Sequence, residues 1–335
     1  MSERLCVIPG DGVGQEVIPA AVTVLEQVLP SVEVVWAEAG WQVFRQSGQA
    51  LPPETLTTAQ DCSAVLFGAV ASPSERVEGY RSPIVALRRE LNTFANLRPV
   101  RSWPGGIGDE RLDLMIVREN TEGLYAGRER REGDTAISER VITRQRSEQV
   151  ARVAFGLAQA SKRRLTLIHK ANVLRVGDGL WREACLAVAG EYPDVPVDET
   201  LVDAAAYHMV RDPGGYDLLL CPNLYGDILS DLAAGLGGGL GMVPSLSVGE
   251  GRAIAEPVHG AAPDIAGQGI ANPIGAILSV AMLVRQYWGK PDAADVIEAA
   301  IVRAIADGIH TRDLAQLGGE WITTELLTRE IINRL

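Results

Sequence analysis

Two aspartates in an otherwise apolar run are the first residues whose types and spacing suggest chemistry. Asp227 and Asp231 are the only ionised groups in "NLYGDILSDLAAGLGGGLG", residues 223–241. Four residues apart, they share one face of a helix, where two like charges repel each other and are costly to remove from water. A divalent cation would remove that repulsion, and carboxylate oxygens suit Mg²⁺ or Mn²⁺. The alternative is a solvated helix face without metal, which the apolar neighbours disfavour.

Arginines form the second group of candidates. Arg88, Arg98 and Arg118 lie in "VALRRELNTFANLRPVR" and "MIVRENTEG". Guanidinium groups bind carboxylates through two parallel hydrogen bonds. Because the chain carries a net charge of −12, an anionic substrate would need such a local positive pocket. Surface ion pairing is the alternative, and it suits Arg118 least, since that residue ends an apolar strand pattern.

Three further side chains suit proton transfer or metal binding. Tyr125 follows "RENTEG" and could donate a proton. Lys170 could act as a base if burial and neighbouring cations lower its pKa. Asp203, in "ETLVDAAAYHMV", could be a third metal ligand. For each of the three taken singly, a structural role is the simpler interpretation.

Short apolar strand patterns alternate with helical patterns, and several strands end in these candidates. Arg118 follows "LMIV", Lys170 follows "LTLIH", and Asn223 follows "LLLCP". Open α/β sheets place ligands at the carboxyl ends of their strands. The alternation therefore predicts an α/β protein with a largely parallel sheet. Helical spacing covers residues 14–29, 147–161, 178–191 and 272–289.

The glycines of "GDGVGQE" resemble a dinucleotide fingerprint without matching it. Gln15 stands where GxGxxG requires its third glycine. We interpret residues 9–16 as a turn before a helix and not as a sign of a Rossmann fold.

Pro- and Gly-rich stretches mark two candidate crossings between domains, at residues 99–108 and 235–251. They predict a first domain of residues 1–98 plus 240–335, which holds both termini, and a second domain of residues 99–239.

Composition argues against several classes of protein. The net charge of −12 disfavours nucleic acid as a partner, and no run reaches the ~18 apolar residues that span a bilayer. The four cysteines are far apart with no CxxC pair, so we expect free thiols. The N-terminal segment lacks the pattern of a secretory signal. We expect a cytoplasmic protein.

Five segments resemble the β-decarboxylating dehydrogenases, the family of isocitrate, isopropylmalate, tartrate and homoisocitrate dehydrogenases. They are "IPGDGVGQEVIPAA", "RENTEGLYAG", "IHKANVLR", "NLYGDILSDLAAGLGGGLGMVPS" and "EPVHGAAPDIAGQGIANP". The resemblance extends nearly end to end. It implies a two-domain α/β fold with a mixed, largely parallel central sheet, distinct from the Rossmann fold. It also implies a homodimer with shared active sites, with a tetramer as the alternative.

The resemblance implies a role for each candidate residue. Asp227 and Asp231 would bind Mg²⁺ (or Mn²⁺) together with Asp203 of the partner subunit. Lys170 of the partner subunit would take the proton of the substrate's C2 hydroxyl, and Tyr125 would protonate the enol left after CO₂ loss. The residues implied in substrate binding are Ser72, Ser82, Arg88, Arg98, Arg118 and Asn172.

In members of this family "HGAAPDIAGQGIAN" holds adenosine. The cofactor contacts implied by this segment and the residue shortly before it are Glu256, His259, Gly260, Ala262, Asp264 and Asn272. Asp264 can accept a hydrogen bond from a ribose 2′-hydroxyl, while its charge repels a 2′-phosphate. Relatives that use NADP have basic and tyrosyl groups at positions 264 and 265, where this chain has Asp264 and Ile265. We expect NAD as the cofactor.

The substrate's variable arm would face "VEGYRSPIVALRREL", whose "SPIVALR" run resembles fungal homoisocitrate dehydrogenases. "RENTEG" fits homoisocitrate and isocitrate enzymes, whereas isopropylmalate enzymes have Thr-Gly-Gly there. Ile84 replaces an asparagine of isocitrate enzymes, and an apolar wall of Ile84 and Val85 would suit an isopropyl group. The expected order is homoisocitrate, which gives 2-oxoadipate in lysine biosynthesis, then isocitrate, then isopropylmalate or tartrate.

A non-catalytic regulatory subunit of a hetero-oligomeric dehydrogenase is the alternative from another class. Such paralogues lose metal-binding or proton-transfer residues, whereas this chain retains the tyrosine, the lysine and all three aspartates. A plain metal-binding scaffold is less suitable still, because it leaves the arginines and the adenosine segment without a role.

Overall fold

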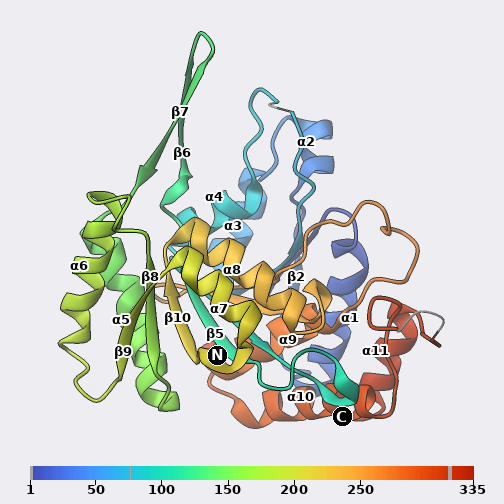
Figure 1. Ribbon diagram of the computed structural model, residues 1–335. Helices are drawn as coiled ribbons and strands as arrows, with labels where there is room; N and C mark the ends of the chain where they lie inside the picture. Colours follow the sequence, from blue (N-terminus) through green and yellow to red (C-terminus); the bar gives the residue numbers. More distant parts are fainter. Residues whose placement is uncertain (1–2, 76, 316–318) are drawn as a thin grey trace.

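A computed structural model describes residues 3–75, 77–315 and 319–335. These residues form a ten-stranded sheet flanked by helices, and a two-stranded hairpin that projects from the body (Figure 1). In sheet order the strands are β2 (Glu33–Trp36), β1 (Arg4–Gly10), β3 (Ala64–Ala69), β12 (Ala253–Pro257), β11 (Pro244–Val248), β4 (Ala95–Arg101), β5 (Asp113–Glu119), β10 (Leu218–Cys221), β8 (Leu165–His169) and β9 (Val197–Leu201). The hairpin pairs β6 (Gly123–Glu132) with β7 (Thr135–Val141).

The large sheet consists of two parallel blocks joined by antiparallel strands. Strands β2, β1, β3 and β12 are parallel to one another, as are β5, β10, β8 and β9. Between the blocks, β11 and β4 pair antiparallel with each other and with both flanking strands. This confirms the predicted mixed, largely parallel sheet, and its strand order differs from that of a Rossmann fold.

Helices lie on both faces of the sheet. They are α1 (Gly14–Val28), α2 (Trp41–Ser47), α3 (Pro53–Asp61), α4 (Pro83–Glu90), α5 (Arg144–Ser161), α6 (Gly177–Ala189), α7 (Val202–Arg211), α8 (Asn223–Leu236), α9 (Ile274–Met282), α10 (Pro291–Ala306) and α11 (Thr324–Ile332). The predicted helices at 14–29, 147–161 and 178–191 are confirmed. The one predicted at 272–289 begins two residues later, and after Met282 it continues as a π-helical turn, Leu283–Tyr287.

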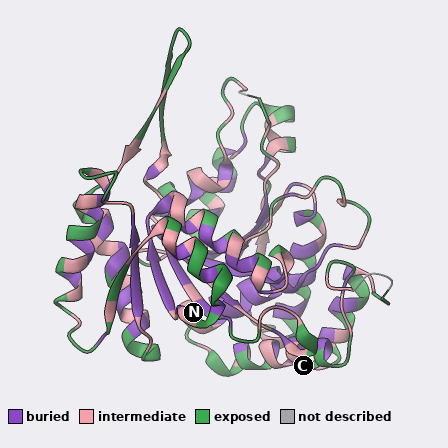
Figure 2. Cartoon of the chain, viewed as in Figure 1, coloured by how far each residue is buried: buried purple, intermediate pink, exposed green. Residues whose placement is uncertain are grey.

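Strand β10 shows how the second parallel block is buried on both faces. Side chains alternate along a strand. Leu218 and Leu220 pack in one hydrophobic cluster with Phe155 of α5. Leu219 and Cys221 pack in another, with helices α7 and α8. Figure 2 shows the same pattern, with buried central strands and a β6–β7 hairpin exposed along most of its length.

The glycine-rich turn after β1 lies in close contact with the backbone of two neighbouring segments. Gly10 has φ +73°, and a Cβ there would lie 2.0 Å from the carbonyl oxygen of Ala69. Gly12 has φ +58°, and a Cβ there would lie 2.0 Å from the carbonyl oxygen of Ala261. The same carbonyl accepts a hydrogen bond from the Val13 N–H at 2.9 Å. The turn before α1 therefore holds the end of β3 and the segment implied in adenosine binding.

The sheet is continuous across both predicted domains. The boundary predicted at 98/99 lies inside β4, and the one at 239/240 directly precedes the short 3₁₀ helix Leu240–Met242. The division into two domains stays a prediction.

Two expectations from composition can be compared with the fold. Across the described ranges, no helix combines the length and the apolar character needed to cross a membrane. The cysteines are all buried and make no disulfide within the described chain; they are Cys6, Cys62, Cys185 and Cys221.

Candidate active site

A cavity of about 220 Å³ lies where residues of the two predicted domains meet. Its walls come from the end of β3, the loop before α4, helix α4, strands β4, β5, β6 and β12, and helix α8. The candidate residues that line it are Ser72, Ser82, Arg88, Arg98, Arg118, Tyr125, Asp227, Glu256 and His259. The fold thus brings together most of the residues implied in substrate binding.

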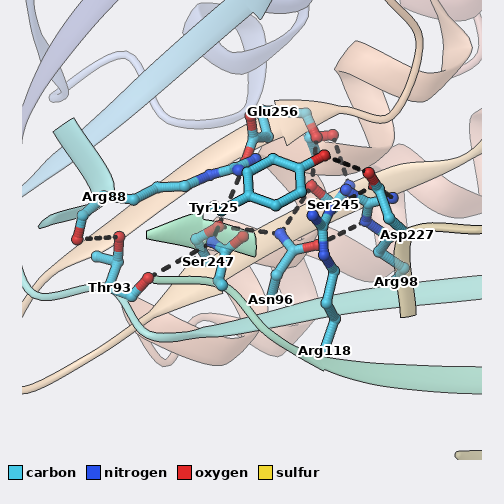
Figure 3. A network of polar contacts seen from close by, with 12 residues as sticks. Arg88, Thr93, Asn96, Arg98, Arg118, Tyr125, Asp227, Ser245, Ser247 and Glu256 are labelled. Carbon is cyan, nitrogen blue, oxygen red and sulfur yellow. Dashed lines mark hydrogen bonds and ion pairs between the residues drawn. The ribbon is translucent and has the colours of Figure 1, made fainter. Parts of the chain in front are cut away.

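Asp227 is the centre of the polar contacts (Figure 3). Its Oδ1 accepts from Arg118 Nη1 at 2.5 Å and from Arg98 Nη1 at 3.3 Å, and its Oδ2 accepts from Tyr125 Oη at 2.6 Å. Burial raises the pKa of this carboxyl, but the charges of Arg118 and Arg98 outweigh it, so the pKa lies below its usual value. The group is held ionised.

Asp231, one turn along α8, has a different environment. Its carboxylate is more than half exposed, and Arg98 Nη1 lies 3.9 Å from its Oδ1. Burial raises its pKa, and the negative charge of Asp227 raises it further, against the opposing effect of Arg98. The repulsion indicated by the sequence is therefore present in the structure.

The two carboxylates fit a hard divalent cation. They supply oxygen donors from one helix face, and a cation between them would offset their mutual repulsion. No group of three His, Cys, Asp or Glu side chains that could hold a metal occurs within the described residues of one chain. A third protein ligand from a second chain, Asp203 of the partner subunit, stays a prediction.

Arg118 is almost completely buried, with 1% of its surface exposed, at the end of β5. Its Nε donates to the Asn223 carbonyl at 2.9 Å and its Nη2 to Asn223 Oδ1 at 3.0 Å. The Asn223 amide in turn donates to Glu119 Oε2 at 3.0 Å. The sequence indicated Asn223 as a candidate by its place after a strand, but assigned it no specific role.

Arg98 lines the cavity with Arg118, and both donate to the same oxygen of Asp227. Its Nη1 donates to Ser230 Oγ at 2.6 Å and its Nε to Asn96 Oδ1 at 2.6 Å. Burial, and secondarily the charge of Arg118, lower the pKa of Arg98 to about 10. Two buried guanidinium groups so close together favour an anion between or above them. Sequence reasoning missed Ser230 and Asn96.

Arg88 of α4 forms a buried ion pair with Glu256 of β12. Glu256 Oε1 accepts from Arg88 Nη2 at 2.6 Å and from Nε at 3.2 Å. The carboxylate of Glu256 thus fixes an arginine, and its predicted contact with the cofactor stays a prediction.

Tyr125 directs its hydroxyl at Asp227, and its ring lies over Arg118, whose guanidinium carbon is 5.0 Å from the ring centroid. Burial raises the pKa of Tyr125, and the hydrogen bond to Asp227 adds to that effect, while the charge of Arg118 opposes it. The phenol therefore keeps its proton at neutral pH, as a proton donor must.

Lys170, Asp203 and Asn172 are among the predicted site residues that do not line this cavity in the same chain. Lys170, after β8, hydrogen-bonds Asp203 in the first turn of α7 through its Nζ. This bond lowers the pKa of Asp203. The Lys170 N–H donates to Asp178 Oδ2 at 2.6 Å, and Asn172 is exposed. The contribution of Lys170 and Asp203 to a partner's site, and that of Asn172 to substrate binding, stay predictions.

The segment implied in adenosine binding begins at the cavity wall with His259. Its Nδ1 lies 3.0 Å from the Gly260 oxygen, and its Nε2 is buried with no hydrogen-bond partner among the described residues. Burial lowers the pKa of His259, so the ring is neutral at pH 7. An unpaired ring nitrogen at the edge of a charged cavity fits a polar group of a cofactor.

The rest of the segment is ordered by protein contacts. Asp264 is exposed, and Ala262 has a positive φ of 40°. Asn272 donates to Asp313 Oδ2 at 3.0 Å, and its Oδ1 accepts from the N–H of Ile274 at the start of α9. This side chain is thus engaged by protein groups. The predicted cofactor contacts of this segment stay predictions.

Comparison with known proteins covers the whole chain. Residues 4–335 match the isocitrate/isopropylmalate dehydrogenase family. The isocitrate/homoisocitrate dehydrogenase of Thermus thermophilus is 46% identical, over 100% of this chain and 99% of the relative. The 3-isopropylmalate/3-methylmalate dehydrogenase of Methanocaldococcus jannaschii is 45% identical, over 99% and 98%. The crystal structure of isocitrate dehydrogenase from Methylococcus capsulatus is 41% identical with a TM-score of 0.95, over 99% of both chains.

The chain belongs to the isocitrate/isopropylmalate dehydrogenase family. Members of this family are NAD(P)-dependent decarboxylating dehydrogenases that act on small acids, generally with a divalent metal, and are typically dimeric. The resemblance seen in the sequence and the fold expected from it are both confirmed.

Proposed function

We propose that the chain catalyses the NAD- and Mg²⁺-dependent oxidative decarboxylation of a (2R,3S)-2-hydroxy acid that carries a 3-carboxylate. Homoisocitrate is the preferred substrate and 2-oxoadipate the product, in lysine biosynthesis through α-aminoadipate. The observation that carries the proposal is the cavity in which Arg88, Arg98 and Arg118 line the walls with Tyr125 and Asp227. Isocitrate is a second substrate, because one methylene changes the discrimination by only about 1–3 kcal/mol.

In this proposal some residues of the site bind the substrate and others transfer protons. The arginines bind the carboxylates of the malate-like part of the substrate. Lys170 of the partner subunit would take the C2 hydroxyl proton, and a bound NAD would supply the oxidant that accepts hydride. Oxidation comes first because a β-keto carboxylate loses CO₂ readily. Tyr125 then protonates the enol. The chemistry that a bound Mg²⁺ supplies, held by Asp227, Asp231 and Asp203 of the partner subunit, is Lewis-acid polarisation of the C2 oxygen.

A homodimer with shared sites is part of the proposal. Helix α7, which carries Asp203, exposes Tyr207 (61%) and Val210 (54%), and helix α8, which carries the aspartate pair, exposes Ile228 (57%). Burial of these apolar side chains against a second copy would lower the free energy of the assembly. The projecting β6–β7 hairpin offers further surface for such a contact. We place the enzyme in the cytoplasm, where buried cysteines without disulfides are usual.

The cavity wall that would face the substrate's variable arm has one feature that favours a second candidate substrate. Ile84 and Val85 line the cavity beside Ser82, and this apolar wall suits the isopropyl group of 3-isopropylmalate. The test is kcat/KM for homoisocitrate, isocitrate, 3-isopropylmalate and tartrate with NAD and Mg²⁺ held constant. We expect homoisocitrate to lead and isocitrate to follow. A lead for isopropylmalate would replace the substrate assignment, and the absence of turnover with every acid would leave a non-catalytic subunit.

Cofactor choice gives a separate prediction. We expect a higher kcat/KM with NAD than with NADP, because the exposed Asp264 carboxylate binds the 2′-hydroxyl and repels a 2′-phosphate. Asp264→Asn should reduce the NAD preference by about tenfold, since a hydrogen bond to a charged group is lost. Asp307→Asn, a surface change distant in sequence from this segment, is the control. A wild-type preference for NADP would contradict the assignment.

A further inference from the structure

A chain of hydrogen bonds connects Arg98 to Arg88, two arginines that line the cavity (Figure 3). Arg98 Nε donates to Asn96 Oδ1 at 2.6 Å, and Asn96 Nδ2 donates to Ser247 Oγ at 2.9 Å. Ser247 Oγ donates to Glu256 Oε1 at 3.3 Å, the same oxygen that accepts from Arg88 Nη2 at 2.6 Å. Arg98 and Arg88 are thus joined through three side chains, those of Asn96, Ser247 and the anionic Glu256.

Strand register creates this chain. Asn96 and Arg98 are two residues apart on β4, so their side chains leave the same face. Antiparallel pairing places Asn96 opposite Ser247 of β11, and Ser245 of β11 opposite Glu256 of β12. Ser245 adds a second link between β4 and β12, because its Oγ accepts from Asn96 Nδ2 at 3.2 Å and donates to the Glu256 carbonyl at 2.9 Å.

The connecting residues are buried. Asn96, Ser245 and Ser247 have 0% of their surface exposed, and Glu256 has 7%. Hydrogen bonds at low dielectric are stronger than at the surface, and a broken one leaves a buried polar group without a partner. A long arginine side chain held this way loses less conformational entropy when a ligand binds.

We propose that Asn96 is a positioning residue of the active site, which together with Ser247 sets the separation of the Arg98 and Arg88 guanidinium groups. This inference rests on the proposed function, in which both arginines bind carboxylates at fixed positions of one small acid. Asn96 acts through the arginines and does not line the cavity. Without its Oδ1, Arg98 Nε has lost its acceptor, and the connection to Glu256 is interrupted.

The kinetic test compares Asn96→Ala and Ser247→Ala with wild type. Because both carboxylates are still intact while the C2 hydroxyl is oxidised, the arginines bind the ground state and the transition state of oxidation alike. Their misplacement therefore raises KM and leaves kcat nearly unchanged. We expect KM to rise about 10- to 100-fold for Asn96→Ala, and about 3- to 10-fold for Ser247→Ala. The factor should be the same for every acid that the wild type turns over, because all share the malate-like part.

A matched control is Ser147→Ala. Ser147, on helix α5, is also a buried serine, and its hydroxyl donates a hydrogen bond to the Thr143 carbonyl at 2.7 Å. This variant should keep the wild-type KM. If Asn96→Ala and Ser247→Ala lower kcat in proportion to lost folded protein while KM stays at the wild-type value, their role is only structural and the inference is overturned.

Two further measurements separate this inference from the proposed function. In a double-mutant cycle, Asn96→Ala with Ser247→Ala should raise KM by less than the product of the single effects, because both interrupt one chain. Crystal structures decide the question even if the wild type turns over none of the four acids. In the Asn96→Ala structure, the Arg98 guanidinium should lose its hydrogen bond to Ser230. If that variant does not fold, the Ser247→Ala structure should show a shifted Arg88 guanidinium. Unmoved guanidinium groups would overturn the inference.

Discussion

Asp227→Asn is expected to lower Mg²⁺-dependent kcat by roughly 100-fold or more. The amide keeps the shape of the side chain but removes its charge. Arg98 and Arg118 then lose the anion that they contact at 3.3 and 2.5 Å, and the cation loses an anionic oxygen. The change leaves two buried guanidinium groups with less compensation, so some loss of stability accompanies the loss of turnover.

Asp231→Asn separates the two effects of Asp227→Asn. Its carboxylate is 58% exposed and lies 3.9 Å from Arg98, so its loss disturbs the protein interior less. We expect a similar loss of turnover with an unchanged melting temperature in the absence of metal. The added readout is the rise in melting temperature on titration with Mg²⁺ or Mn²⁺, which both variants should lose. Asp61→Asn, on the exposed end of α3, is the control. Near-wild-type turnover in both variants would reject the metal site.

Lys170→Met is the second change with a large expected effect. Methionine keeps the unbranched shape of the side chain up to its terminal amine but cannot accept a proton, so kcat should fall by about 10²–10⁴-fold. Within one chain Lys170 contacts Asp203 and does not line the cavity. A large loss of activity is therefore expected only if this lysine reaches the cavity of a second copy.

Mixed dimers test that arrangement directly. A dimer of one Lys170→Met chain and one Asp227→Asn chain, purified through two different tags, would have both changes in one site and neither in the other. It should recover about half the wild-type kcat per dimer, because one of its two shared sites is intact. Dimers that carry either change in both chains are the controls and should stay inactive. An inactive mixed dimer would mean that the lysine and the aspartate serve the same chain's site, contrary to the proposal.

Local pattern was sufficient to predict the elements and the residue types of the site. The spacing of Asp227 and Asp231 predicted one helix face, and α8 presents both side chains beside the same arginine. The strand pattern before Arg118 predicted a buried arginine at a strand end, which β5 confirms. These predictions succeed because a helix repeats every 3.6 residues and a strand every two, so neighbours in sequence determine which face a side chain occupies.

Roles assigned through family resemblance went further than the pattern alone. They named Ser72 and Ser82, and they gave Arg88, already a candidate by residue type, a place in substrate binding; a loop and a short helix bring these residues to the cavity wall. Nothing in their immediate sequence neighbourhood predicts this, since an arginine in "ALRRE" has the composition of any helix surface.

The sequence by itself determined which chemical groups this protein has and on which faces of which elements they lie. Only the tertiary structure decided their partners. Arg88 and Glu256 are 168 residues apart, and Asn96 and Ser247 are 151 apart. Arg88 meets Glu256 because α4 packs against β12, with Leu87 and Ile254 in one hydrophobic cluster. Asn96 and Ser247 meet because β11 lies antiparallel beside β4 in one particular register. A shift of one residue in that register would turn Ser247 to the opposite face of the sheet. Such pairing depends on the packing of the whole sheet, which no local pattern contains.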